Sequence, residues 1–139
     1  FAARCGLLHD IGKARVPLEI LTAPRRLDDR EWPVMRAHAS AGEAMIRHDP
    51  RLRVFAPAVR SHHERLDGRG YPDGLRASAI PQIARVVAVA DCFNAMIGRR
   101  PYRVPMAPSR AMDELDAHRS TQFDPDVVDA MISLVEVRS

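Results

Sequence analysis

Two adjacent histidines, His62 and His63, lead directly into a loop of glycine, charged residues and proline. Of all the features in the sequence, this stretch restricts most strongly which fold the chain can adopt. The loop has the sequence ERLDGRGYP over residues 64–72. Glycine and proline in such a cluster end helices and form turns, whereas ordinary core helices have little use for a histidine pair. The stretch therefore indicates metal ligands at the end of a helix, followed by a loop that covers a site.

Length and composition restrict the class of protein. A chain of 139 residues with 46% apolar and 28% charged residues has the size and profile of one globular domain. No apolar run approaches the roughly 18 residues that span a bilayer. The net charge of +3 is too small to indicate a nucleic-acid polymer as partner, although it suits a small anionic ligand.

The two cysteines, Cys5 and Cys92, lack metal-type spacing, and a reduced, cytoplasmic setting is the simplest interpretation. The chain starts at Phe1 without a methionine or a helix cap, already in a helical pattern. We therefore expect residues 1–139 to be one domain that is incomplete on its N-terminal side and cut from a longer polypeptide.

Apolar spacing predicts an all-α domain of six or seven helices. Residues 83–90 are rich in β-branched side chains, but apolar positions recur at 83, 86, 87, 90, 93 and 97, which favours a helix over a strand. The first helix should stop at Gly12. His38 should lie near the end of a helix that begins after Asp28, where Glu31 completes a capping box. Further helices are expected over residues 39–48, 52–64, 80–97, 107–118 and from 124 onward.

A second histidine is also followed by a possible ligand, since Asp10 comes directly after His9. Neighbouring side chains on a helix point about 100° apart, so each pair, His9-Asp10 and His62-His63, can reach two nearby points of one site. Histidine with carboxylate and no thiolate suits Fe, Mn, Zn or Ni. Because a carboxylate can bridge two ions, a dinuclear site is consistent with this set.

Other candidates have structural alternatives. Asp91 lies in an apolar helix, and a buried carboxylate needs a cation or hydrogen-bond donors, so either a metal or an arginine partner would explain it. His38 could be a helix-dipole partner or a core residue. Lys13 could be a solvated charge, and the basic run 99–103 a solvated helix end. The co-occurrence of these residues gives the metal-site interpretation its weight.

Taken in order, the motifs resemble those of the HD-GYP family, a branch of the HD-domain metal phosphohydrolases. They are HDIGK at 9–13, His38, HHERLDGRGYP at 62–72, Asp91 and RPYR at 100–103. The resemblance extends over nearly the whole chain. It implies an all-helical HD core with an added helical pair, and a phosphodiesterase that hydrolyses cyclic di-GMP to pGpG or GMP in bacterial signalling.

The resemblance also implies roles for individual residues. The implied metal ligands are His9, Asp10, His38, His62, His63 and Asp91. Asp10 would bridge the ions and Lys13 would assist proton transfer, which makes these two the catalytic residues. Arg100 and Arg103 would hold substrate phosphates.

Gly70 and Tyr71 would line the substrate cleft. The implied cofactors are two or three divalent metal ions, Fe or Mn in the first place and Zn or Ni as alternatives. The implied partners are a cyclic dinucleotide substrate, an upstream regulatory or receiver domain, and GGDEF-type signalling proteins.

Two alternatives stay open. A catalytically degenerate domain would sense cyclic di-GMP or dock a protein, and Asn94, at a position where many family members have Asp, favours this reading. The retained histidines and carboxylates argue against it. The second alternative is a phosphohydrolase of another nucleotide, which the Gly68–Pro72 loop and the two arginines of 100–103 argue against.

Overall fold

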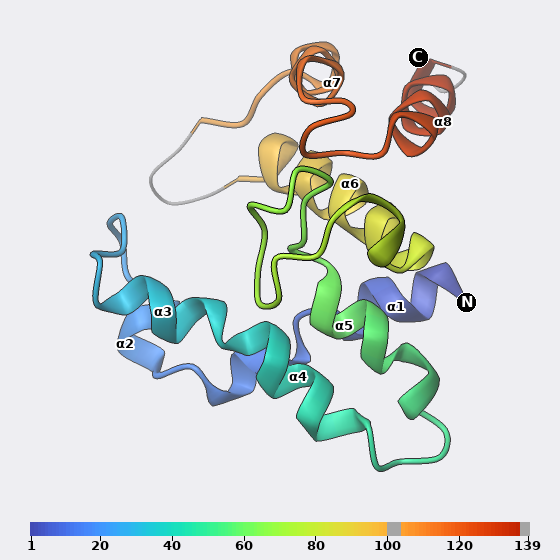
Figure 1. Ribbon diagram of the computed structural model, residues 1–139. Helices are drawn as coiled ribbons and strands as arrows, with labels where there is room; N and C mark the ends of the chain where they lie inside the picture. The colour runs from blue at the N-terminus through green and yellow to red at the C-terminus, as the bar shows by residue number, and fades with distance from the viewer. Residues whose placement is uncertain (100–103, 137–139) are drawn as a thin grey trace.

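The computed structural model describes residues 1–99 and 104–136, and helices form its framework (Figure 1). In these two ranges no β-strand is present, only two isolated bridges, and the predicted all-α class is confirmed. The α-helices are α1 (Ala2–Leu8), α2 (Leu18–Leu21), α3 (Glu31–Arg36), α4 (His38–Ile46), α5 (Ala56–Ser61), α6 (Gln82–Ile97), α7 (Pro108–Ala117) and α8 (Pro125–Glu136). Short 3-10 turns are η1 (Ile11–Arg15), η2 (Arg53–Phe55) and η3 (Ala77–Ala79).

Helix α6 lies between two groups of helices and contributes to two hydrophobic cores (Figure 1). Val87 faces the first core, which is formed with α1, α4 and α5. Val89, Phe93 and Met96 face the second core, which is formed with α7 and α8. Burial on both sides explains why the β-branched run of α6 is stable as a helix, because packing outweighs local propensity.

The predicted capping box at the start of α3 is confirmed. One oxygen of Asp28 accepts the backbone N–H groups of Arg30 and Glu31, each at 2.9 Å. The Glu31 carboxylate accepts the Asp28 N–H at 3.0 Å and pairs with both guanidinium nitrogens of Arg25 at 2.7 Å. These contacts satisfy amides that the first helical turn leaves without partners.

Several predicted helix boundaries are wrong. The helix expected over residues 52–64 is a 3-10 turn, η2, followed by α5, which stops at Ser61 before the histidine pair. Helix α1 ends at Leu8, and Gly12 lies inside η1 rather than at a helix stop. His38 begins α4 instead of ending α3. Gly12 has a packing role: a Cβ on it would lie 1.9 Å from the His38 carbonyl oxygen and 2.5 Å from the Gly42 nitrogen. The chain therefore needs glycine here to bring η1 against α4.

Helix α6 departs from its predicted apolar face at one position. Ala90, one of the recurring apolar positions, is exposed and lines an open groove with Ala2 and Gly6 of α1. Its neighbours Val87 and Phe93 are buried as expected. None of the described helices is long and apolar enough to cross a membrane.

Candidate metal centre

Three histidines are oriented by the same local contact. The Nδ1 atoms of His9, His38 and His62 lie 2.6, 2.6 and 2.7 Å from a carbonyl oxygen three residues earlier in the chain. A carbonyl only accepts, so Nδ1 carries the proton in each ring. The Nε2 lone pair is left for another partner, which is the usual arrangement of a metal-ligating histidine.

Asp10 is placed between two sets of side chains. Its Oδ1 lies 3.4 Å from His38 Nε2 and 3.9 Å from His62 Nε2. Its Oδ2 lies 3.2 Å from His9 Nε2 and 2.6 Å from Lys13 Nζ. Each carboxylate oxygen thus faces a different group, which is the geometry that a bridging ligand between two ions requires.

The remaining predicted ligands lie around this carboxylate. One ligand atom each from Asp10, His38, His62 and His63 can be chosen so that all lie within 4.8 Å of one another. Asp91 Oδ1 lies 3.6 Å from His9 Nε2. The structure therefore brings together all six residues that the sequence suggested as ligands, from α4, α6 and the segments that follow α1 and α5.

The donor atoms fit a cation. His38 Nε2 and His62 Nε2 face each other at 3.4 Å, and both are lone-pair atoms if each Nδ1 carries the proton. His9 Nε2 is buried and has no hydrogen bond of good geometry among the described residues. Buried acceptors directed at one point without donors are unfavourable alone, and a divalent ion would satisfy them.

The pKa values of the site agree with this fit. Burial lowers the pKa of His62 to about 4 and that of His63 to about 3, so both are neutral and able to coordinate. Burial of Asp10 opposes its ionisation, but the His9 and Lys13 side chains beside it outweigh burial and hold its pKa well below the usual range. Asp10, and then Asp91, raise the pKa of His9 to about 10, so a cation would displace a proton there.

The loop after the histidine pair folds back over the centre. The Tyr71 ring stacks on His63, with ring centres 4.7 Å apart and planes inclined by 25°. Gly70 makes this possible, because a Cβ on it would lie 2.4 Å from the Glu64 Cα. The Tyr71–Pro72 peptide is cis. The buried Glu64 carboxylate accepts three backbone N–H groups, of residues 73, 74 and 75, at 2.7, 3.1 and 2.9 Å.

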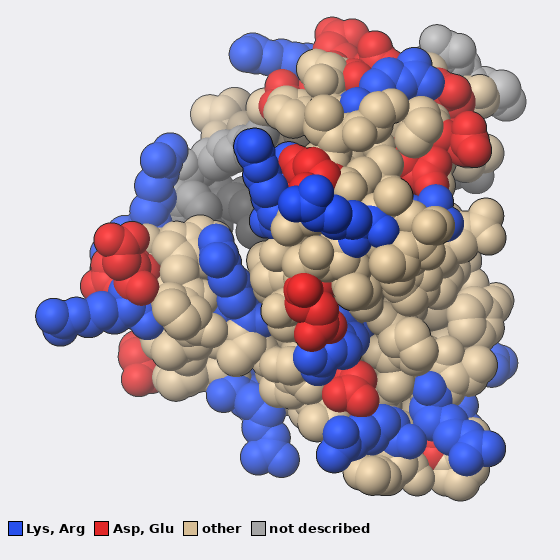
Figure 2. Space-filling model, viewed as in Figure 1, with Lys and Arg blue, Asp and Glu red and all other residues tan. Residues whose placement is uncertain are grey.

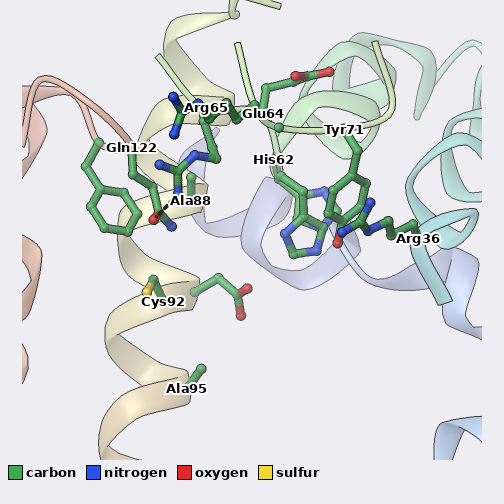
Figure 3. Close-up of a pocket in the computed structure, with 14 residues that line it drawn as sticks. Arg36, His62, Glu64, Arg65, Tyr71, Ala88, Cys92, Ala95 and Gln122 are labelled. Carbon is green, nitrogen blue, oxygen red and sulfur yellow. Dashed lines mark hydrogen bonds between the residues drawn. The ribbon is translucent and has the colours of Figure 1, made fainter. Parts of the chain in front are cut away.

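A cleft of about 370 Å³ opens beside the centre and is lined by His62 and His63, by Gly70 and Tyr71, and by residues of α6 (Figure 3). Among the lining residues that the sequence did not suggest are three with hydrogen-bonding side chains, Arg36, Arg65 and Gln122. Arg65 is hydrogen-bonded to Gln122 and ion-paired with Asp67. The only available signal for Arg36 was its place two residues before His38, which is weak.

The predicted phosphate-binding residues Arg100 and Arg103 lie outside the described residues. Acidic and basic side chains are interspersed over the face shown in Figure 2, so no extended surface of one sign marks a nucleic-acid interface on that face.

Family comparison agrees with the site. A family model described as an HD domain matches residues 2–127, and the chain belongs to this family. The resemblance to HD-GYP proteins is also confirmed. An HDG"Y"P protein from Bdellovibrio bacteriovorus superposes with a TM-score of 0.73 at 18% identity, covering 94% of this chain and 41% of that one.

Curated relatives carry related names. The chain is 42% identical over 127 residues to the cyclic di-GMP phosphodiesterase response regulator RpfG of Xanthomonas campestris pv. campestris, and 40% identical over 129 residues to a cyclic di-GMP phosphodiesterase of Thermotoga maritima. It is 37% identical over 128 residues to 3'3'-cGAMP-specific phosphodiesterase 3 of Vibrio cholerae. These matches cover 90%, 91% and 92% of this chain, but only 34%, 35% and 28% of the relatives.

Proposed function

We propose that the chain is the catalytic domain of a metal-dependent phosphodiesterase that hydrolyses cyclic di-GMP to pGpG or GMP. The observation that carries this proposal is the position of Asp10, whose two oxygens face two separate sets of possible ligands. The choice of cyclic di-GMP as substrate is supported by two relatives that are named cyclic di-GMP phosphodiesterases.

In this proposal the metal ligands are His9, Asp10, His38, His62, His63 and Asp91, and the ions are two or three divalent ions, Fe or Mn first. Such ions stabilise charge on a phosphate and supply a nucleophilic water near neutral pH. Lys13, with Nζ 2.6 Å from Asp10, would hold the proton that the departing 3′ oxygen needs. Arg100 and Arg103 would bind substrate phosphate.

Tyr71 has a separate role in this proposal. Burial raises the pKa of its phenol, so the ring remains neutral and can pack against the substrate without adding charge. Gly70 allows the loop to approach closely enough to place that ring over His63.

The physiological setting is part of the proposal. An upstream regulatory or receiver domain would control the activity, as the name of the response-regulator relative suggests, with GGDEF-type proteins in the same pathway. In this proposal the hydrolysis of the cyclic dinucleotide takes place in the cytoplasm.

Replacement of Asp10 tests the proposal. In protein purified without oxygen, Asp10→Ala should lose most bound metal and lower cyclic di-GMP turnover by at least about 100-fold, since a charged ligand is removed. Metal content and product formation are measured on the same preparation. Asp29→Ala, at an exposed position, is the matched control. Survival of both metal and turnover in Asp10→Ala would contradict the proposal.

A second candidate substrate is 3'3'-cGAMP, because relatives with 35–37% identity are named as specific for it. The reaction and the metal centre would be the same. Parallel assays of the two cyclic dinucleotides distinguish the candidates, and binding of either without product would favour a sensor instead.

A further inference from the structure

Arg36 occupies a particular position beside the candidate metal centre. It is the last residue of α3, and its guanidinium carbon lies 5.8 Å from the ring centre of Trp32 and 5.3 Å from that of Tyr71. Trp32 precedes it by one helical turn, whereas Tyr71 comes from the loop after the histidine pair. Two separate segments thus supply aromatic rings to one cation.

The charge of Arg36 has no acidic partner in the part of the chain that the structure describes. The ion pairs found there engage other arginines, at positions 25, 51, 60, 65, 85 and 119. The two carboxylates of the metal centre, Asp10 and Asp91, face His9 instead. A guanidinium that contacts aromatic rings keeps N–H donors in its plane for an anion.

Arg36 points toward the metal centre. It lines the same cleft as His62, His63 and Asp91. Figure 3 shows its side chain extending to the Tyr71 ring. Because Tyr71 stacks on His63, Arg36 is one aromatic ring away from a candidate metal ligand.

We propose that Arg36 binds oxygen atoms of the phosphodiester held at the metal centre, and that Trp32 and Tyr71 are positioning residues for its guanidinium. This inference rests on the proposed phosphodiesterase function and adds a phosphate ligand to that site. Arginine suits the role because its planar fork donates two parallel hydrogen bonds to a phosphate. A purely structural role explains the arrangement less well, since the side chain is exposed and its ring contacts are weak at exposed sites.

Phosphate binding to this residue can be observed directly. Trp32 is the only tryptophan of the chain, and it lies beside Arg36, so its fluorescence reports on ligands at this point. The manganese-loaded protein is titrated with inorganic phosphate. Arg36→Gln should weaken phosphate binding about 10- to 100-fold, the size expected for losing charged hydrogen bonds, while manganese stoichiometry stays unchanged. Arg30→Gln, just before α3 and away from the cleft, should bind phosphate as wild type does.

Kinetics provide the second measurement. Arg36→Gln should raise KM by a similar factor for both cyclic di-GMP and bis(p-nitrophenyl) phosphate, a phosphodiester without a base. Arg36→Lys keeps the charge without the planar fork, so it should bind phosphate better than Arg36→Gln but more weakly than wild type. If Arg36→Gln folds poorly, this lysine variant provides the test alone.

Two results would overturn the role of Arg36. One is unchanged phosphate affinity in Arg36→Gln or, if only the lysine variant folds, wild-type affinity in Arg36→Lys. The other is loss of manganese together with phosphate binding, which would make Arg36 a support of the metal centre. If wild type binds phosphate through Arg36 but hydrolyses no cyclic dinucleotide, the proposed function fails while the phosphate site stands.

Discussion

Gly12 determines how closely two ligand-bearing segments can approach. It lies in η1, two residues after Asp10, and its Cα packs against the backbone at the start of α4, which begins with His38. A Cβ would meet the His38 carbonyl oxygen at 1.9 Å, a contact with backbone that cannot rotate away. Asp10 can therefore lie close to His38 only because residue 12 has no Cβ.

Gly12→Ala should cost about 1–3 kcal/mol of unfolding free energy because the two segments must separate. It should also weaken manganese binding, since Asp10 moves away from His38. Urea denaturation and metal titration measure the two effects.

Gly6→Ala is the matched control for this change. No atom lies within 4 Å of its added Cβ, and it lies within α1, so the variant should be stabilised by about 0.5–1 kcal/mol. Equal stability of the two alanine variants would show that the close approach at Gly12 is unimportant.

The ligand set could be predicted from residue types and order, because histidines and carboxylates carry their chemistry wherever the chain folds. Gly12 could not be interpreted correctly in the same way. A glycine after a helix is typical of a helix stop, and the backbone of α4 that excludes a side chain is 26 residues further along. Arg36 was missed for a related reason, since its ring contact with Tyr71 exists only in the folded chain.

At the scale of elements, the loop over residues 67–75 is held from inside by one carboxylate. Glu64 is only 4% exposed and accepts N–H groups from three successive residues. The loop is also joined to the connection between α7 and α8, because the Asp67 N–H donates to the Thr121 carbonyl at 2.9 Å. These contacts fix the position of Tyr71 without any regular secondary structure.

Glu64→Gln should loosen this loop, because an amide NH2 would face backbone N–H groups that need an acceptor, at a cost of about 1–3 kcal/mol. Amide hydrogen exchange over residues 73–75 should become faster, and KM for cyclic di-GMP should rise more than kcat falls. Glu19→Gln, at an exposed position in α2, should change neither measurement. Unaltered exchange at 73–75 would argue against Glu64 as the anchor.

Helix positions followed from apolar periodicity, and the capping box located the start of α3, since both signals act within a few residues. The division between α3 and α4 at His38 has no such local signal. The exposure of Ala90 was also unpredictable, because periodicity identifies an apolar face but not which part of that face another element covers.

For the whole molecule, the candidate ligands connect elements that are distant in sequence. Residues 9 and 10 follow α1, His38 begins α4, residues 62 and 63 follow α5, and Asp91 lies in α6. The ions held by these residues would together cross-link four parts of the fold. Binding to the folded state alone would therefore stabilise the entire domain.

A chelator should accordingly lower the Tm of the metal-loaded protein. At a free metal concentration of about 100 times Kd the added stability is about 2.7 kcal/mol, which corresponds to a Tm difference of several degrees for a domain of this size. Thermal unfolding with and without chelator measures it, and Asp10→Ala should abolish the difference. A Tm that is the same in both conditions would mean that the metal does not bridge these elements.

The spread of the candidate ligands from residue 9 to residue 91 also bears on biosynthesis. While the chain leaves the ribosome, the first histidine emerges long before Asp91, and the contact of Asp67 with Thr121 forms later still. A nascent chain would thus complete its metal centre only after Asp91 had been made, and the contact that ties down the loop of Tyr71 would form only once Thr121 had followed. Metal insertion would therefore follow the synthesis of α6 rather than accompany that of the first helices.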